Sequence, residues 1–144
     1  MDRVPIIYDD GILRLIPQRP PMVMVDKFFG VEGTRSWSGL TVATGNLFCQ
    51  AGFLQESGLI EHIAQSAAAR IGYLYATRGE EPPLGFIGSV DKFSLHALPK
   101  VGEELLTTLT VVQEVGDITL VSAQVEAGGH PIADCQMKIF IKKE

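Results

Sequence analysis

The sequence predicts an α+β domain in which an antiparallel sheet wraps around one long helix. Helical periodicity is confined to one segment, 57–77, and four strand-like segments follow it with no second helix between them. Consecutive strands joined by tight turns pair antiparallel, whereas strands alternating with helices would form a parallel sheet. The chain has 144 residues, the length of one ordinary domain, so we expect residues 1–144 to form a single unit.

The central helix is predicted over Ser57–Thr77, with Ser57 as its N-cap. Pro82-Pro83 prevents the helix from resuming beyond Gly79. Small residues are frequent in the segment and its polar face is thin, which is typical of a buried helix. The apolar residues recur every three or four positions, at Ile60, Ile63, Ala64, Ala67, Ile71, Leu74 and Tyr75.

The strands are predicted from β-branched or alternating apolar runs between turn residues. Met22–Val31 and Ser36–Thr44 precede the helix, and Asp10–Ile16 is either a short helical turn or an extended arm. Residues 46–57 have no clear period and are expected to form a loop with at most a short turn. The four later strands are predicted at Leu84–Leu95, Glu103–Glu114, Ile118–Glu126 and Pro131–Ile141.

Composition excludes several classes of function. The net charge is −5 and no basic stripe is present, so we do not expect nucleic acid as a partner. No apolar run is long enough to span a bilayer and no signal peptide is visible, which favours a cytoplasmic protein. Cys49 and Cys135 lie in different elements and are expected to be buried free thiols. No metal, nucleotide or flavin motif is present, so we expect no metal and no cofactor.

Four segments carry recognisable motifs in a fixed order. They are Leu15–Asp26 (Leu-Ile-Pro-Gln-Arg-Pro, an apolar run, then Asp), Glu61–Gln65 (Glu-His-Ile-Ala-Gln), Gly85–Phe93 (Gly-Phe-Ile-Gly, ending in Phe) and Leu98–Leu105 (Leu-Pro-Lys-Val-Gly-Glu-Glu-Leu). Together they resemble the β-hydroxyacyl-acyl carrier protein dehydratases. The resemblance spans nearly the whole chain, and it implies the hot-dog fold, in which the sheet encloses the central helix.

One segment departs from that family's pattern. In the resembled family a His-Phe-Pro-Gly loop precedes the helix and its histidine is catalytic, whereas Phe48–Gly58 contains no histidine. Gln18 also replaces the opening histidine, at a position that is not normally catalytic. Residues 46–65 are similar instead to a divergent dehydratase-like branch found beside polyene and polyketide-type synthesis enzymes.

Dehydration needs a base for the α-proton, an acid for the leaving hydroxyl, and donors for the thioester oxygen. The resemblance implies that Glu61 is the active-site acid, buried between helix and sheet, and that Gln65 orients it from the same helix face. The alternative is a first-turn acid that faces solvent and favours the helix dipole. Substrate contacts are implied at Gly58, where N–H groups would bind the thioester oxygen, and at Phe86, Gly88 and Phe93.

Other reactive side chains are expected to have ordinary roles. His62 follows Glu61 and points about 100° away around the helix. We therefore expect it to be an ordinary polar residue or a dimer contact. His96 and His130 lie near strand ends and are expected to be exposed. Cys49 would border the site, but no base that could activate it is visible.

The resemblance implies a 3-hydroxyacyl-thioester dehydratase-like protein of fatty-acid or polyketide/polyene-type biosynthesis, acting on acyl carrier protein or CoA thioesters. A single-carboxylate hot-dog thioesterase and a non-catalytic acyl-binding partner subunit remain as alternatives. We expect at least a homodimer, or a trimer of dimers, because open sheet edges tend to pair. An acidic carrier protein would need a local basic patch, for which the candidates are Arg19, Arg70, Arg78, Lys92 and Lys100.

Overall fold

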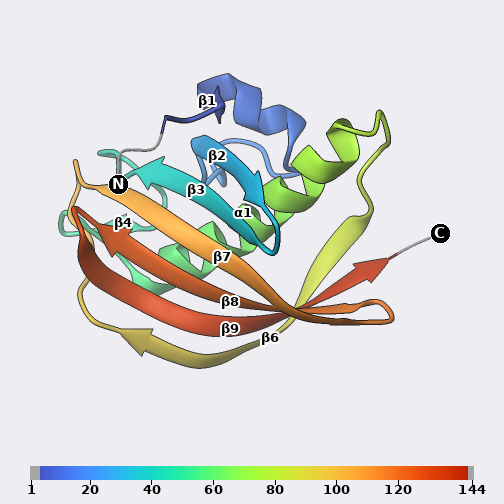
Figure 1. Cartoon of the computed structure of the whole chain (residues 1–144). Helices are drawn as coiled ribbons and strands as arrows, with labels where there is room; N and C mark the ends of the chain where they lie inside the picture. The colour runs from blue at the N-terminus through green and yellow to red at the C-terminus, as the bar shows by residue number, and fades with distance from the viewer. Residues whose placement is uncertain (1–3, 143–144) are drawn as a thin grey trace.

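The computed structural model describes residues 4–142, and there a seven-stranded antiparallel sheet curves around one helix (Figure 1). The strand order is β1-β2-β3-β7-β8-β9-β6, and β4 and β5 form a separate small ribbon. This arrangement confirms the predicted fold class. In chain order the elements are β1 (Ile7–Tyr8), a 3-10 helix (Asp9–Arg14), β2 (Lys27–Glu32), β3 (Arg35–Thr41), β4 (Cys49–Gln50), β5 (Phe53–Leu54), α1 (Glu56–Ala76), β6 (Leu84–Leu95), β7 (Glu104–Val115), β8 (Ile118–Ala127) and β9 (His130–Lys142).

The long elements lie within a few residues of their predicted bounds, and β6 coincides with its prediction. The strand predicted from Met22 begins only at Lys27. The reason is that the backbone N–H of Met24 donates to Oε1 of Gln65 on the helix, at 2.6 Å, and not to a neighbouring strand. The three two-residue strands β1, β4 and β5 were not predicted, because two residues carry no periodicity.

The helix begins at Glu56, with Gln55 in the N-cap position, so the prediction of Ser57 as N-cap was wrong. Gln55 makes no side-chain capping bond. Instead its backbone N–H donates to the carbonyl of Phe48 at 3.0 Å, so the β4–β5 region holds the start of the helix. This contact fixes the position of the first helical turn.

The helix is covered on two sides, which explains its thin polar face. Leu59, Ile63 and Ala67 pack into the main core formed with β7, β8 and β9. Ala69 belongs to a second core with residues of the N-terminal arm and β2, namely Ile12, Leu15, Ile16, Val25 and Phe28. A helix enclosed in this way presents few positions to solvent.

Gly72 is the point at which the N-terminal arm crosses the helix. A Cβ atom at this position would overlap the carbonyl oxygen of Leu15, a backbone atom with little freedom to move. The absence of a side chain therefore allows the arm to lie directly on the helix. This close approach carries the following residues, including Gln18 and Arg19, to the side of the helix that bears Glu61.

The strand β6 forms one edge of the sheet and pairs only with β9 among the described strands. Its first half exposes apolar side chains: Leu84 is 51%, Phe86 53% and Ile87 44% exposed. Between residues 4 and 142, no helix is long and apolar enough to cross a membrane.

Candidate active site

The site is built around a carboxylate and an amide one helical turn apart. Nε2 of Gln65 donates a hydrogen bond to Oε2 of Glu61 at 2.7 Å, as their spacing predicts. Gln65 is fully buried, and its Oε1 accepts from the N–H of Met24 while its Nε2 also donates to the carbonyl of Met22 at 2.7 Å. The amide therefore connects the helix to the arm and holds the carboxylate in one orientation.

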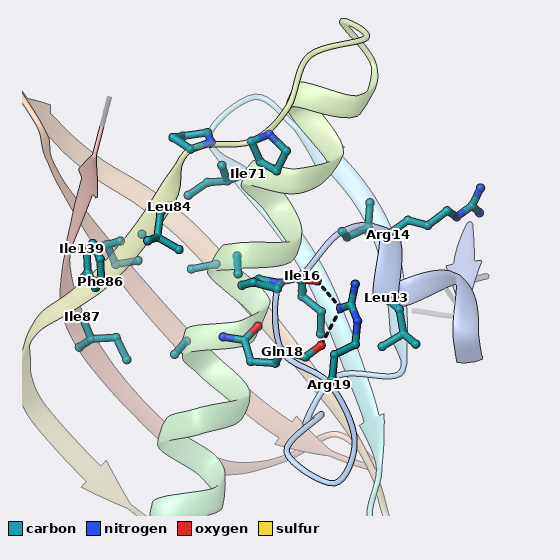
Figure 2. Close-up of a pocket in the computed structure, with 18 of the residues that line it drawn as sticks. Leu13, Arg14, Ile16, Gln18, Arg19, Ile71, Leu84, Phe86, Ile87 and Ile139 are labelled. Carbon is teal, nitrogen blue, oxygen red and sulfur yellow. Dashed lines mark hydrogen bonds between the residues drawn. The ribbon is translucent and has the colours of Figure 1, made fainter. Parts of the chain in front are cut away.

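Glu61 lies on the wall of a cavity of about 700 Å³ and is half-buried. It was expected to be buried inside the helix–sheet core, whereas it is only half-buried. The helix forms the back of the cavity, the arm with Arg14 and Arg19 forms one side, and β6 with Ile139 of β9 forms the other (Figure 2). This volume is within the range of small-molecule binding sites.

The cavity wall is mainly apolar apart from Glu61 and a few polar side chains. The helix contributes Ala64, Ala67, Ala68 and Ile71 to it. Small alanines near the carboxylate leave room for a ligand, because larger side chains would fill the space. An apolar cavity with one fixed acid suits an acyl chain that carries its reactive carbons close to the acid.

Gln18 enters the same cavity from the arm, a placement that its sequence motif did not indicate. Figure 2 shows its side chain pointing toward the helix. Its Oε1 atom is buried and has no hydrogen-bond partner among the described residues. Arg19 fixes the neighbouring backbone, since Nη1 donates to the carbonyls of Ile16 at 2.9 Å and Gln18 at 2.8 Å.

The four expected substrate contacts lie in different places. Phe86 lines the cavity. Gly88 and Phe93 are not among the lining residues: a Cβ at Gly88 would overlap the ring of Phe140, and Phe93 packs against the main core. The N–H of Gly58 donates to the carbonyl of Gln55 at 3.0 Å, so it is occupied rather than free.

His62 was expected to be an ordinary polar residue or a dimer contact, and it is fully buried within the chain, which does not fit a dimer contact. Its Nδ1 lies 2.7 Å from the carbonyl oxygen of Met24, and its Nε2 lies 2.7 Å from Oγ1 of Thr107. A carbonyl only accepts, so Nδ1 carries the hydrogen and Nε2 of the neutral ring accepts from the hydroxyl. Burial lowers the pKa of His62, although the bond to Met24 and the charge of Asp26 oppose that shift. This histidine joins the helix to β7 and faces away from the cavity lining.

The other two histidines are exposed and also lie outside the cavity. His96 pairs with Asp134 of β9 at 2.9 Å, and His130 begins β9. Each of the three histidines in the sequence is therefore placed, and none lines the cavity that bears Glu61. The cavity is lined by two carboxylates, the half-buried Glu61 and the exposed Glu81, but by no imidazole from this chain.

The two cysteines are free and neither lines the cavity. Cys135 is buried, as expected, and burial raises the pKa of its thiol to about 11. Cys49 is only half-buried, which corrects the expectation that both thiols are buried; desolvation nevertheless raises its pKa. Neither thiol is activated as a nucleophile. Within the described range, no three histidine, cysteine or acidic residues group closely enough to hold a metal ion.

The sheet, the enclosed helix and the carboxylate-bearing cavity define a hot-dog protein with a mainly apolar cavity beside its helix. The model of the ApeP-like family, described as ApeP dehydratase, matches residues 11–144. The chain belongs to this dehydratase family, which confirms the dehydratase-like function that the motifs indicated.

Individual relatives give the same picture. The chain is 29% identical over 119 residues to a 3-hydroxyacyl-[acyl-carrier-protein] dehydratase FabZ of Desulfotalea psychrophila, and the match covers 79% of each chain. Its fold is similar to the dehydratase heterocomplex ApeI:P from Xenorhabdus doucetiae, with a TM-score of 0.78, 16% identity, and coverage of 99% of this chain and 94% of that one. A hypothetical thioesterase from Streptococcus pneumoniae with coenzyme A has a TM-score of 0.66 at 9% identity, over 82% and 86% of the two chains. The last two likenesses concern the fold alone.

Proposed function

We propose that this chain is the carboxylate-bearing subunit of a 3-hydroxyacyl-thioester dehydratase, and that its substrate is presented by an acyl carrier protein. The observation that carries the proposal is the position of Glu61 on the wall of a mainly apolar cavity, with one carboxylate oxygen held by Gln65. The 29%-identical relative acts on acyl-carrier-protein substrates according to its name, which supports the choice of carrier. Fatty-acid or polyketide/polyene-type biosynthesis would use such a reaction.

The reaction can run through a single carboxylate. Glu61 removes the α-proton from C2, and the electrons of that C–H bond are held as the enolate of the thioester. The carboxylic acid then returns the proton to the hydroxyl on C3, which leaves as water with the electrons of the C–O bond while the enolate electrons form the C2–C3 double bond. The products are the enoyl thioester and water, and the carboxylate is regenerated. A positioned acid or base of this kind contributes roughly 10²–10⁴-fold in rate.

A partner chain that pairs along β6 would enclose the cavity and supply a second catalytic group. Leu84, Phe86 and Ile87 line the cavity and are exposed along the edge strand, so a neighbouring strand would cover its open side. The dehydratase complex from Xenorhabdus doucetiae is a heterocomplex, which supports an unlike partner as well as a second copy. A homodimer, or a trimer of dimers, would use the same edge.

Two further proposals concern the carrier and the compartment. Arg14 and Arg19 stand at the side of the cavity, and Arg19 is one of the basic candidates named from the sequence. An acidic carrier would approach these side chains, and its binding should therefore weaken with salt.

Two unpaired cysteines fit a reducing compartment such as the cytoplasm.

A single-carboxylate thioesterase is the second candidate, because the cavity contains no histidine and a carboxylate alone can activate water. The test is incubation of a 3-hydroxyacyl thioester, on carrier protein and on CoA, with the chain alone and with its partner. Absorbance of the conjugated enoyl thioester supports the dehydratase, and release of free thiol supports the thioesterase. If neither product forms in any combination, the chain is a non-catalytic acyl-binding subunit and the proposal is wrong.

A further inference from the structure

A second, smaller cavity lies behind the first, between the C-terminal half of α1 and the inner face of the sheet. Its volume is about 180 Å³. The helix contributes Leu74 and Tyr75 to its wall, and β7 and β8 contribute Leu109 and Val121. Leu109 is 1% and Val121 2% exposed, so the sheet side of this cavity is apolar. Four charged residues also line it. Arg78, Glu114 and Asp117 are exposed and mark the solvent side, whereas Arg70 is half-buried and its Nη1 is buried without a hydrogen-bond partner among the described residues.

The two cavities share part of their walls. Ala67, Ile71 and Ile139 line both of them. Ala67 and Ile139 are buried, whereas Ile71 is half-buried. Figure 2 shows Ile71 projecting from the helix on the side of β6 and β9, where Ile139 lies. The partition therefore includes two branched residues and one alanine.

Such a partition can limit the length of a ligand. A β-branched side chain has few χ1 rotamers in a helix, so Ile71 forms a stiff wall rather than an adaptable one. An acyl chain that begins beside Glu61 and follows the helix toward its C-terminus meets Ala64, Ala67 and then Ile71 in order. Beyond Ile71 the second cavity offers apolar space against Leu109 and Val121 of the sheet.

We propose that Ile71 and Ile139 set the acyl-chain length of the substrate by closing off the second cavity, and that this cavity receives the distal end of longer chains once the side chain of Ile71 is shortened. The inference rests on the proposed function only for the nature of the ligand, an acyl thioester. It assigns a specificity-determining role to two residues and a binding role to a cavity remote from the carboxylate.

Binding of saturated acyl thioesters tests the idea without requiring turnover. Affinities of a chain-length series of acyl-pantetheines are measured by calorimetry on the full chain in its native assembly. Each methylene that enters apolar space should improve the affinity about fourfold, the equivalent of about 0.8 kcal/mol. For the wild type we expect the affinity to stop improving once the acyl chain exceeds a limiting length.

Ile71→Ala should move that limit to chains longer by at least about two methylenes, since it removes most of the helix side of the partition. Ile71→Val is a milder variant and should shift the limit in the same direction by less. Leu74→Trp fills the second cavity from a position that does not line the first. As a single substitution, Leu74→Trp should leave the affinity for short acyl chains unchanged. In the double variant it should cancel the increase in limiting chain length that Ile71→Ala produces.

The possible outcomes separate this inference from the proposed function. If Ile71→Ala leaves the limit unchanged, or if Leu74→Trp fails to cancel the gain, the second cavity does not receive the chain and the inference is wrong. If the wild type binds no acyl-pantetheine of any length, both the inference and the proposed function fail. Thermal melts of each variant show whether the fold is retained.

Discussion

Gln65 donates to Oε2 of Glu61 at 2.7 Å, and it is the only described side chain that holds this carboxylate by a hydrogen bond. The orientation of the amide is fixed by its other two partners. The N–H of Met24 must donate and the carbonyl of Met22 must accept, so Oε1 and Nε2 of Gln65 cannot exchange places. One carboxylate oxygen is thereby engaged, which leaves the other to exchange a proton with a substrate.

Replacement of Glu61 by Gln should abolish turnover and leave the fold intact. Gln has nearly the same shape but cannot exchange a proton near neutral pH, so the rate should fall by roughly 10²–10⁴-fold. Turnover of a 3-hydroxyacyl thioester and a thermal melt are the two measurements. Glu56→Gln is the matched control, because Glu56 is an exposed acid in the first turn of the same helix. Activity of Glu61→Gln close to that of the wild type would remove Glu61 from the site.

The two glutamines of the site should respond in opposite ways to substitution by Leu. Gln65→Leu leaves the N–H of Met24 and the carbonyl of Met22 without partners, at a cost of roughly 1–3 kcal/mol for each buried group. Gln18→Leu removes an Oε1 atom that is buried without a partner, so its free energy of unfolding should be unchanged or higher. Urea denaturation measures both. A loss of stability in Gln18→Leu as large as in Gln65→Leu would contradict this assignment.

Stability should decrease as the pH falls below about 6.5, the ordinary pKa of histidine. Burial lowers the pKa of His62 in the folded chain. Below pH 6.5 the unfolded state therefore binds the proton first, and the stability that the neutral ring contributes is lost as the pH falls toward the folded value. Denaturation curves between about pH 7.5 and 5 measure this slope.

His62→Asn should be less stable at pH 7.5 and should lose most of that slope, because Asn does not titrate. His96→Gln and His130→Gln are controls that remove exposed histidines, and they should keep the slope. If His62→Asn keeps the wild-type slope, another group is responsible for the pH dependence.

Gly72→Ala should destabilise the protein, although Ala is the better helix former. Helix propensity alone favours Ala by up to about 1 kcal/mol. The added Cβ would overlap the backbone of Leu15, and overpacking of this kind typically costs about 1–3 kcal/mol. The sign of the change in a thermal melt decides between the two effects. A more stable Gly72→Ala variant would show that the arm moves away at little cost.

Phe86→Lys should weaken assembly through β6. Phe86 is 53% exposed on the edge strand, and a charge at an edge opposes pairing with another strand. Light scattering of the chain, alone and with its partner, should show a shift toward monomer. Val115→Lys is the control, since Val115 is 60% exposed but ends β7. Equal effects of the two variants would place the interface elsewhere.

The fold was predictable because apolar residues recur regularly along the helix and the long strands. The places where the prediction failed have local causes. The run from Met22 to Asp26 is as apolar as a strand. However, the side chain of Gln65 on the helix binds the N–H of Met24 and the carbonyl of Met22, in place of a neighbouring strand. His62 was misplaced because its direction, about 100° from Glu61 around the helix, was taken to lead away from the interior. In the structure Met24 and Thr107 of β7 enclose the ring on that side.

The candidate site was predictable only where spacing decides geometry. Glu61 and Gln65 are four residues apart on a helix, so their contact follows from helical pitch. Gln18 lies 43 residues before Glu61 in the sequence, and only the crossing at Gly72 brings its arm to the cavity. The likeness to a motif suggested Gly88 as a ligand contact, whereas the bare backbone there accommodates the ring of Phe140.

The two edge strands of the sheet differ greatly in length, which limits how far the protein can associate at high concentration. β6 has twelve residues, whereas β1 at the opposite edge has two. A two-residue strand is too short to template another chain, so association through β6 closes after one step and does not propagate into fibres. A chain whose β6 stays unpaired would retain an open apolar edge at Leu84, Phe86 and Ile87.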